Sequence, residues 1–206
     1  MSTSTYIYIF GESEITIWGL TGRERLQRML QTHEHIQLVD DAEKIPANAT
    51  ALFLNSNFLF DARVLTALLG VNKKVALYND EGCPAAIRTD GSQAPQILRN
   101  LNNNKSQNYK FVLLIIPRIG LHDLKIDFQQ NLKKKDPPYI LPVSETNRPL
   151  LEKELFSGSY KGVTDLVTKW VWPLPAFWVT HYCVRQGWQP NHVTYLSIVL
   201  AILTGL

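Results

Sequence analysis

The chain has 206 residues, a formal net charge of +3, 45% hydrophobic residues and 19% charged residues. This composition is typical of a globular protein with one substantial core, and it excludes a wholly disordered chain. The basic residues are dispersed apart from residues 133–135, so the charge argues against a nucleic-acid-binding surface. The two cysteines lack metal-ligand spacing and the N-terminus lacks a basic and then apolar leader, so we expect a reducing compartment and no signal peptide.

The first 120 residues alternate between strand-like and helix-like segments. Strands are predicted at residues 6–10, 14–18, 36–39, 50–54 and 75–78, with an edge strand at 85–89 and a central strand at 111–116. Helices are predicted from the N-cap Thr21 to about residue 31, from the N-cap Asp61 to residue 69, and over residues 94–101. This alternation predicts an α/β fold with a mainly parallel sheet and helices on both faces.

The second half begins with a polar loop or linker at residues 131–138. A last strand is predicted at 139–143, a short helix at 150–156 and a flexible joint at 157–159. Residues 163–184 then interleave tryptophans and aliphatic residues, in a pattern broken by Pro173 and Pro175. Four of the five tryptophans lie between residues 170 and 188, directly before the uncharged residues 193–206. That position favours an interfacial belt at a membrane, with an ordinary core as the alternative.

The uncharged run at residues 193–206 is too short to cross a bilayer, which needs about 20 apolar residues. The run stops without a polar flank, so we expect a fragment, or a truncated reading frame, of a longer membrane protein. The predicted organisation is a cytosolic α/β domain at 1–156, an interfacial amphipathic segment at 157–189, and the start of a first transmembrane helix at 190–206.

Two short stretches carry a resemblance to a known family. Residues 161–170 read KGVTDLVTKW, and residues 187–197 read GWQPNHVTYLS. This resembles the start of the first membrane helix in CDP-alcohol phosphotransferases, which opens with P-N-x-[VI]-T-x-x-S. The residues that match this opening are Pro190, Asn191, Val193, Thr194 and Ser197. The resemblance covers about the last fifth of the chain.

The resemblance implies auxiliary contacts with phosphates. Lys161 and Asp165 correspond to the lysine and aspartate that precede the interfacial helix in the family, although Leu166 stands where a glycine is usual. Lys161, Lys169 and Arg185 would then contact lipid or substrate phosphates at the cytosolic face, or only satisfy the positive-inside preference. Asn191 or Thr194 would satisfy free amide groups at the start of the helix.

The family resemblance also implies partners and a compartment. These are membrane lipid, a CDP-alcohol, a second copy of the chain in a homodimer, and the bacterial inner membrane, with Mg²⁺ or Mn²⁺ in the full enzyme. The family's catalytic motif, D-x2-D-G-x2-A-R-x8-G-x3-D-x3-D, does not occur in these residues. No catalytic residue, cofactor or metal ligand is therefore assigned to this chain, and we expect the chain alone to be inactive.

The first part resembles the nucleotidyltransferase-like domain fused ahead of such enzymes, which implies a Rossmann-related fold. Residues 23–30 correspond to its first helix, residues 52–61 (LFLNSNFLFD) to a segment usually reading v-x-G-D-x-x-f-D, and residues 140–155 to its closing strand and helix. The long Gly-rich loop with a lysine is missing, and Asn57 replaces the metal-binding aspartate. These departures predict a degenerate, inactive domain.

Two other functions stay open. Gly19 and Gly22, with Arg23 or Arg25 beside them, would form a small phosphate cradle in an active CTP-dependent sugar- or polyol-phosphate nucleotidyltransferase, although the pattern favours a plain strand-to-helix turn. The chain would otherwise be a non-catalytic membrane-docking module. His181 and Cys183 lie near one another without an acidic partner in the sequence around them, which favours a packing role.

Overall fold

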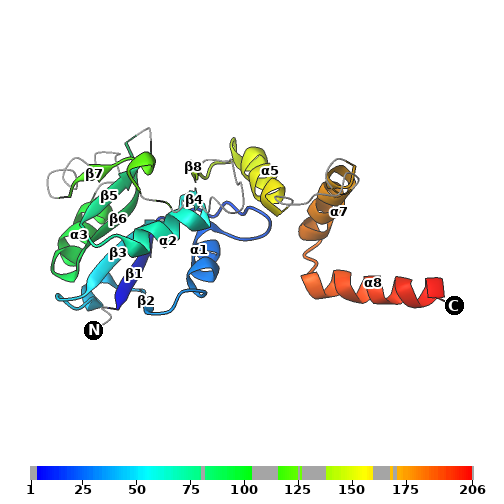
Figure 1. The fold of residues 1–206 in the computed structure, drawn as a ribbon, viewed down its shortest axis with the longest axis horizontal. Coiled ribbons are helices and arrows are strands. Elements are labelled where there is room, and N and C mark those ends of the chain that lie inside the picture. The colour runs from blue at the N-terminus through cyan, green and yellow to red at the C-terminus, as the bar shows by residue number, and fades with distance from the viewer. Residues whose placement is uncertain are drawn as a thin grey trace. The chain divides into compact units, whose positions relative to one another are not determined.

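The computed structural model describes residues 4–79, 82–103, 116–124, 126, 138–159, 168 and 171–205. The chain divides into two compact units, shown with their elements in Figure 1. The first unit consists of Met1–Ile15 and Thr21–Leu151, and the second consists of Thr16–Leu20 and Glu152–Leu206. Each unit has its own packing and is described by itself.

A six-stranded, mainly parallel sheet forms the centre of the first unit (Figure 1). Its strands, in spatial order, are β2 (Ile36–Val39), β1 (Thr5–Phe10), β3 (Thr50–Asn55), β6 (Pro84–Asp90), β5 (Val75–Tyr78) and β7 (Arg118–Ile119). Strand β1 pairs in parallel with β2 and β3, and β5 pairs in parallel with β7, whereas β6 is antiparallel to both of its neighbours. A second, two-stranded sheet joins β4 (Phe58–Phe60) to β8 (Ile140–Pro142).

Helices cover both faces of the large sheet, which confirms the predicted fold class. On one face, α1 (Gly22–Leu30) and α2 (Ala62–Gly70) pack against side chains that include Leu52 and Leu54 of β3. On the other face, α3 (Ala94–Asn103) packs against Phe53 of the same strand. Successive side chains of a strand point to opposite faces, so β3 is buried continuously from Ala51 to Asn55.

Local signals in the sequence fix the starts of α1 and α2. The hydroxyl of Thr21 accepts a hydrogen bond from the amide of Glu24 at 3.2 Å, and the Glu24 carboxylate accepts one from the amide of Thr21 at 2.8 Å. The Thr21 amide and hydroxyl both donate to the Glu24 carboxylate, and these two bonds hold the pKa of Glu24 below its ordinary value. Asp61 accepts a hydrogen bond from the amide of Arg63 at 2.9 Å. Both predicted N-caps are therefore confirmed.

Two strand predictions were wrong. Residues 85–89 lie within β6, which pairs with β3 on one side and β5 on the other and is not an edge strand. Residues 14–18 form no strand with a neighbour. Instead, Ile17 and Leu20 form an isolated antiparallel bridge around Trp18 and Gly19, whose φ angles are 52° and 74°. Positive φ at both central residues is the signature of a tight type I′ turn.

The predictions for the second unit also need correction at two points. Helix α5 (Arg148–Ser159) continues through residues 157–159, so these residues do not form a flexible joint. The prolines do not interrupt a helical pattern, because Pro173 and Pro175 lie in the first turn of α7 (Pro173–Arg185). A proline is tolerated there because the first amides of a helix have no intrahelical acceptor.

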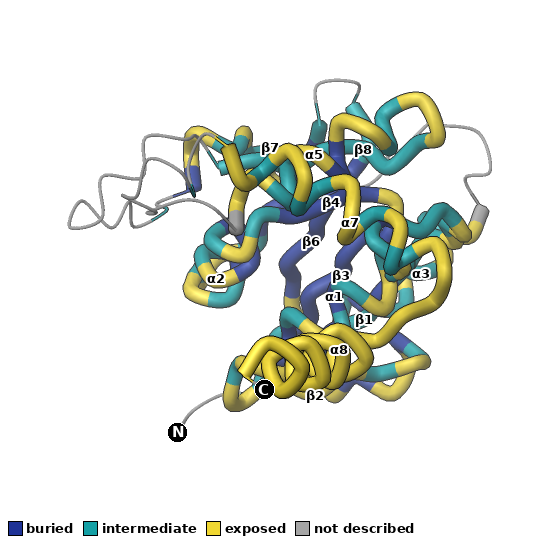
Figure 2. Tube along the Cα trace, turned by 90° about the vertical axis from the view of Figure 1, so that its right-hand side faces the viewer, coloured by how far each residue is buried: buried dark blue, intermediate teal, exposed yellow. Residues whose placement is uncertain are grey.

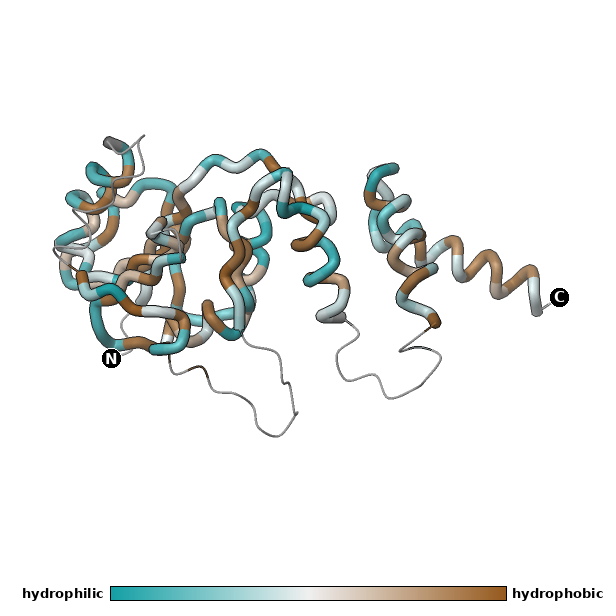
Figure 3. The backbone as a smooth tube through the Cα atoms, turned by 90° about the horizontal axis from the view of Figure 1, so that it is seen from above, coloured by the Kyte–Doolittle hydropathy of each residue, from teal (hydrophilic) through white to brown (hydrophobic). Residues whose placement is uncertain are grey.

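Helix α8 (Pro190–Gly205) confirms that a helix begins at Pro190. It is exposed along its described length, as the yellow tube in Figure 2 shows, and mostly hydrophobic, as Figure 3 shows. Within the described ranges, no helix has both the length and the apolar character needed to cross a membrane. Residues 111–115 of the predicted central strand at 111–116, and residues 131–137 of the predicted linker, lie outside the described residues.

We predict that Tyr78→Phe stabilises the first unit by about 1 kcal/mol. The Tyr78 hydroxyl is buried, and no hydrogen-bond partner for it occurs among the described residues. Burial raises the pKa of Tyr78 to about 12, with Arg118 opposing the shift. A pKa higher in the folded state gives stability that is complete below the ordinary value of 10.0 and is lost as the pH rises towards 12.

Denaturant unfolding at pH 8 and pH 11 checks this prediction. The loss of stability between the two values should be smaller in Tyr78→Phe than in the parent chain, and Tyr195→Phe, at an exposed tyrosine of α8, should behave as the parent. A Tyr78→Phe chain that is less stable at pH 8 would mean that the hydroxyl has a partner.

Candidate functional site

The order of the strands in the large sheet reverses between β1 and β3. From β1 the chain passes through α1 to β2 on one side, and then returns to β3 on the other side of β1. In open α/β sheets, ligands bind outside the carboxyl ends of the strands at such a reversal. Here Phe10 at the end of β1 lies opposite Asn55 at the end of β3, and the residues after them define the candidate site.

Close backbone packing closes this edge of the sheet. Gly11 has a φ of +92°, and a Cβ atom placed on it would lie 2.6 Å from the side-chain oxygen of Asn55. The hydroxyl of Ser56 donates to the carbonyl of Gly11 at 2.9 Å, and the Asn55 amide group donates to the carbonyl of Pro84 at 3.1 Å. Asn55 also accepts a hydrogen bond from the amide of Asn57 at 3.0 Å. The polar groups at this edge therefore form hydrogen bonds largely with one another.

The charges around the edge are poorly suited to a triphosphate. Glu12 and Glu14, both exposed, follow β1, and no lysine occurs between residues 11 and 22. The guanidinium of Arg23 donates to the carbonyl of Ile9 at 2.8 Å, and burial lowers the pKa of Arg25. Carboxylates repel phosphate oxygens, so the described residues of this edge do not form the positive cradle that nucleotide phosphates need.

The described residues of the site do not group carboxylates around a position for a divalent metal. Asn57 is exposed and offers only an amide, while Asp61 caps α2 and is paired with Arg63. In the part of the chain that the structure describes, no three His, Cys, Asp or Glu side chains lie close enough together to hold a metal ion. Divalent Mg²⁺ prefers carboxylate oxygens, so Asn57 is a poor replacement.

The two glycines of the predicted phosphate cradle belong to different units. Gly19 lies in the second unit, where a Cβ atom on it would lie 3.4 Å from Val184. Gly22 lies in the first unit, where a Cβ atom would lie 1.9 Å from the carbonyl oxygen of Ser56. Close packing therefore accounts for Gly22, and the nucleotide-binding role of Gly19, Gly22 and the neighbouring arginines stays a prediction.

An aromatic cluster holds the second unit together. The ring of Trp18 lies 5.9 Å from that of Phe156 and 5.4 Å from that of Phe177, and its indole N–H donates to the carbonyl of Glu152 at 2.8 Å. His181 lies in the same cluster, and its Nδ1 atom is 3.7 Å from the carboxylate of Glu152. The position of His181 among these rings agrees with the predicted packing role, and Glu152 of α5 is an acidic neighbour that the sequence around His181 did not reveal.

The structure describes only part of the predicted phosphate-contacting set. Lys161, Asp165 and Lys169 lie outside the described residues. Arg185 is exposed at the end of α7, and Asn191 is exposed at the start of α8.

Asn191 or Thr194 was predicted to satisfy a free amide at the start of the helix, but Thr194 does not do so. Its hydroxyl donates to the carbonyl of Pro190 at 3.2 Å, because a threonine one turn into a helix faces the carbonyl four residues before it. The side chain that accepts from a free amide is His192, whose Nδ1 atom accepts from the amide of Gln189 at 3.3 Å.

Comparison with known proteins gives distant structural likenesses alone. No family model matches the sequence, and no curated protein matches it. Among solved structures, the chain is similar to a glycosyltransferase involved in the glycosylation of the major capsid of PBCV-1. The two chains are 13% identical with a TM-score of 0.37, and the alignment covers 56% of this chain and 80% of the other.

We predict that Gly22→Ala destabilises the first unit by about 1–3 kcal/mol or more, because the added methyl group would overlap a backbone carbonyl that has little freedom to move. Gly70→Ala is the matched control, since no atom lies within 4 Å of the position of its Cβ. The control should change the free energy of unfolding by less than about 1 kcal/mol. Equal denaturation midpoints for the two variants would contradict the close packing of Gly22 on Ser56.

Proposed function

We propose that this chain is the N-terminal part of a membrane-bound CDP-alcohol phosphotransferase. The full enzyme would transfer the phospho-alcohol group of a CDP-alcohol to a hydroxyl acceptor and release CMP, in phospholipid or polar-solute synthesis. The observation that carries the proposal is α8, an exposed apolar helix that opens with the P-N-x-V-T-x-x-S pattern. Other exposed side chains of the second unit also support a membrane environment.

Exposed apolar side chains are concentrated in the second unit. Among the described residues, every exposed large hydrophobic side chain except Leu38 and Leu150 belongs to the stretch from residue 171 to residue 203. Trp172 and Trp178 are 58% and 69% exposed, and Trp188 precedes α8. A large apolar surface of this kind marks a protein or membrane contact, and tryptophans favour the boundary between lipid and water.

The polar groups of α8 suit an apolar solvent. The hydroxyls of Ser197 and Thr204 donate to the carbonyls of Val193 and Leu200 at 2.9 Å and 3.0 Å, in the same manner as Thr194. An unpartnered hydroxyl is costly in lipid, and these bonds remove that cost. Residues 186–206 contain no Asp, Glu, Lys or Arg. The 16 residues of α8 are about 24 Å long, less than the roughly 30 Å of a hydrocarbon core.

In this proposal the first unit is an auxiliary domain without its own transfer activity. The closed and partly acidic edge at the ends of β1 and β3 supports this assignment, as does Asn57 in place of a carboxylate. Catalysis would belong to the D-x2-D-G-x2-A-R motif, which these 206 residues do not contain. The carboxylates of that motif would hold Mg²⁺ or Mn²⁺, and the metal would polarise the pyrophosphate of the CDP-alcohol.

We predict that the chain binds lipid vesicles through α8. In flotation with vesicles of phosphatidylcholine and phosphatidylglycerol, the parent chain should move with the lipid. Leu200→Lys should reduce the bound fraction strongly, because a lysine near the centre of an inserted helix costs about 2.5–3.5 kcal/mol.

Leu38→Lys is the matched control for this experiment. Leu38 is 43% exposed on β2 of the first unit, and Leu200 is 53% exposed on α8. The control variant should float as the parent chain does. Recovery of the parent chain in the lipid-free fraction, or equal flotation of Leu200→Lys, would argue against insertion of α8.

We also predict that this chain releases no CMP from CDP-diacylglycerol or CDP-glycerol in the presence of Mn²⁺ and vesicles. The physical reason is that it contains none of the aspartates of the family motif, which would hold the metal. The measurement is CMP release followed by chromatography, with a chain extended into the D-x2-D-G-x2-A-R motif as the positive comparison. Release of CMP by the 206 residues would place catalysis inside them and overturn the proposal.

A further inference from the structure

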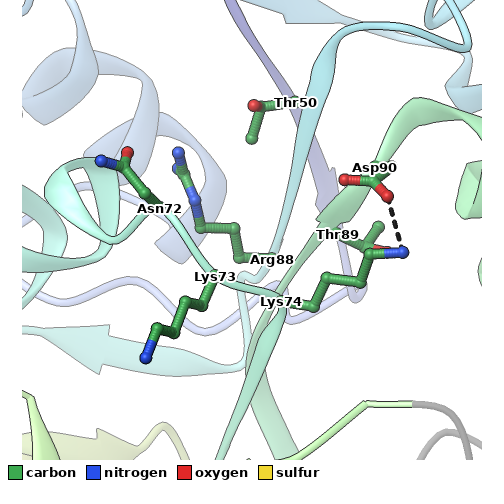
Figure 4. A pocket seen from close by; sticks show the side chains of 7 residues that line it. All are labelled: Thr50, Asn72, Lys73, Lys74, Arg88, Thr89 and Asp90. Carbon is green, nitrogen blue, oxygen red and sulfur yellow. Dashed lines mark ion pairs between the residues drawn. The ribbon is translucent and has the colours of Figure 1, made fainter.

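A polar cavity lies at the opposite edge of the large sheet from the site described above. Its volume is about 320 Å³, and it is found where β3 and β5 begin and the antiparallel β6 ends. Figure 4 shows the side chains that line it, and those that matter here are Thr50, Asn72, Lys73, Lys74, Arg88 and Asp90. All of them belong to the first unit.

Arg88 is a buried cation in this cavity. It is only 6% exposed, and its strand register places it opposite Leu52 and Val75, on the face of the sheet that α2 covers. One guanidinium nitrogen donates to the carbonyl of Leu68 at 3.2 Å. A guanidinium has five N–H donors, so most of them are left for other acceptors.

No carboxylate within the described ranges lies within 4.0 Å of Arg88. Burial lowers the pKa of Arg88, because the charged form has lost water without gaining an anion. A buried charge without a counter-charge is destabilising, so an anion in the cavity would compensate for a real energetic cost.

The other cations of the cavity differ in their surroundings. Lys74 forms an ion pair with Asp90 at 2.6 Å and donates to the side-chain oxygen of Gln93 at 3.2 Å. In Figure 4 the guanidinium of Arg88 lies between the side chains of Asn72 and Thr50, whereas Lys73 extends away from it. Arg88 is therefore the charged group left for direct contact, with the Thr50 hydroxyl and the Asn72 amide as neutral neighbours.

The charge of the cavity matches a phosphate group. Its lining contains three cations and one carboxylate, which leaves a net charge of +2. A phosphate monoester carries roughly −1.5 to −2 at pH 7. The planar guanidinium offers parallel N–H donors that fit two phosphate oxygens at once, which a lysine ammonium cannot do.

We propose that this cavity binds the phosphate group of a small solute, either free phosphate or a phosphate monoester, through Arg88. Thr50 and Asn72 contribute neutral hydrogen bonds, and Lys73 attracts the anion without contacting it. The site lies in the first unit, so this proposal does not depend on lipid binding by α8 or on the catalytic motif. The competing explanation is that Arg88 only neutralises the carbonyl end of α2, where a cation is favoured.

The test uses the full chain and inorganic phosphate as the probe, at constant ionic strength maintained with NaCl. Calorimetric titration should give a saturable binding curve, and the thermal midpoint should rise with phosphate and level off. Arg88→Gln keeps an amide donor for the Leu68 carbonyl and removes the charge, so it should abolish the saturable response. Arg99→Gln, at an exposed arginine of α3, is the matched control and should respond as the parent does.

Lys73→Glu keeps the test decisive if Arg88→Gln does not fold. Lys73 is exposed and forms no hydrogen bond or ion pair with the other described residues, and reversing its charge near the anion should weaken binding about five- to tenfold. Parallel titration with glycerol 3-phosphate separates the two sources. Tighter binding of inorganic phosphate would identify the ligand as the free ion, and tighter binding of glycerol 3-phosphate would identify it as a phosphate monoester. A parent chain that responds to phosphate no more than to chloride overturns the proposal, as does an unchanged affinity in Lys73→Glu.

Discussion

The parallel pairing of β1 with β3 is the constraint on which the rest of the first unit depends. It places β3 between β1 and β6 with helices on both faces, so Leu52 and Phe53 enter different halves of the core. The same register sets Phe10 opposite Asn55, and the chain must turn sharply beyond both residues. Gly11 and Gly22 then lie against backbone and side chains too closely for any Cβ atom. The packing that stabilises the core thus also closes the edge at which an α/β sheet ordinarily binds its ligand.

The two edges of the sheet differ in chemistry for a topological reason. At the carboxyl edge, the groups that face one another are amides, hydroxyls and carbonyls that pair among themselves. The antiparallel course of β6 brings Arg88 towards the other edge, under the last turn of α2. There the guanidinium donates to the carbonyl oxygen of Leu68, which carries only a partial charge, and it has no carboxylate partner among the described residues. A strand parallel to β3 at this position would have its amino end, and not its carboxyl end, at that edge.

The sequence predicts well what short-range chemistry decides. The capping pattern of Thr21 with Glu24 and the cap at Asp61 locate two helices, and both are confirmed because capping bonds lie within one turn. Residues 85–89 were predicted as an edge strand, but β6 lies between β3 and β5 and contains the buried Arg88. Its burial depends on the Leu68 carbonyl, which is 20 positions away in the sequence. Strand β4 was missed for the same reason, since its three residues pair only with β8.

The candidate sites were harder to predict than the fold. A Gly-x-x-Gly pattern is local, and nothing local reveals that Gly19 and Gly22 fall in different units. The alternation of residues 14–18 resembled a strand, although Trp18 lies in a turn that tertiary contacts stabilise. A tryptophan at a φ of 52° is unfavourable in isolation, and the rings of Phe156 and Phe177 with the Glu152 carbonyl offset that cost.

Helix α7 exposes apolar side chains as well as packing them into the second unit. Phe177 packs against Trp18 in the aromatic cluster, while its neighbour Trp178 is 69% exposed. Leu174 and Val179 are likewise exposed, so most of the exposed side chains of α7 are apolar, with Thr180 and Arg185 as exceptions. A helix that is apolar all round is stable when another apolar phase covers it. The uncharged α8 follows after a short turn, and its hydroxyls bond to its own carbonyls. A protein partner would need complementary shape along both helices, whereas the interface and core of a bilayer require only apolar surface, aromatic side chains and satisfied backbone groups.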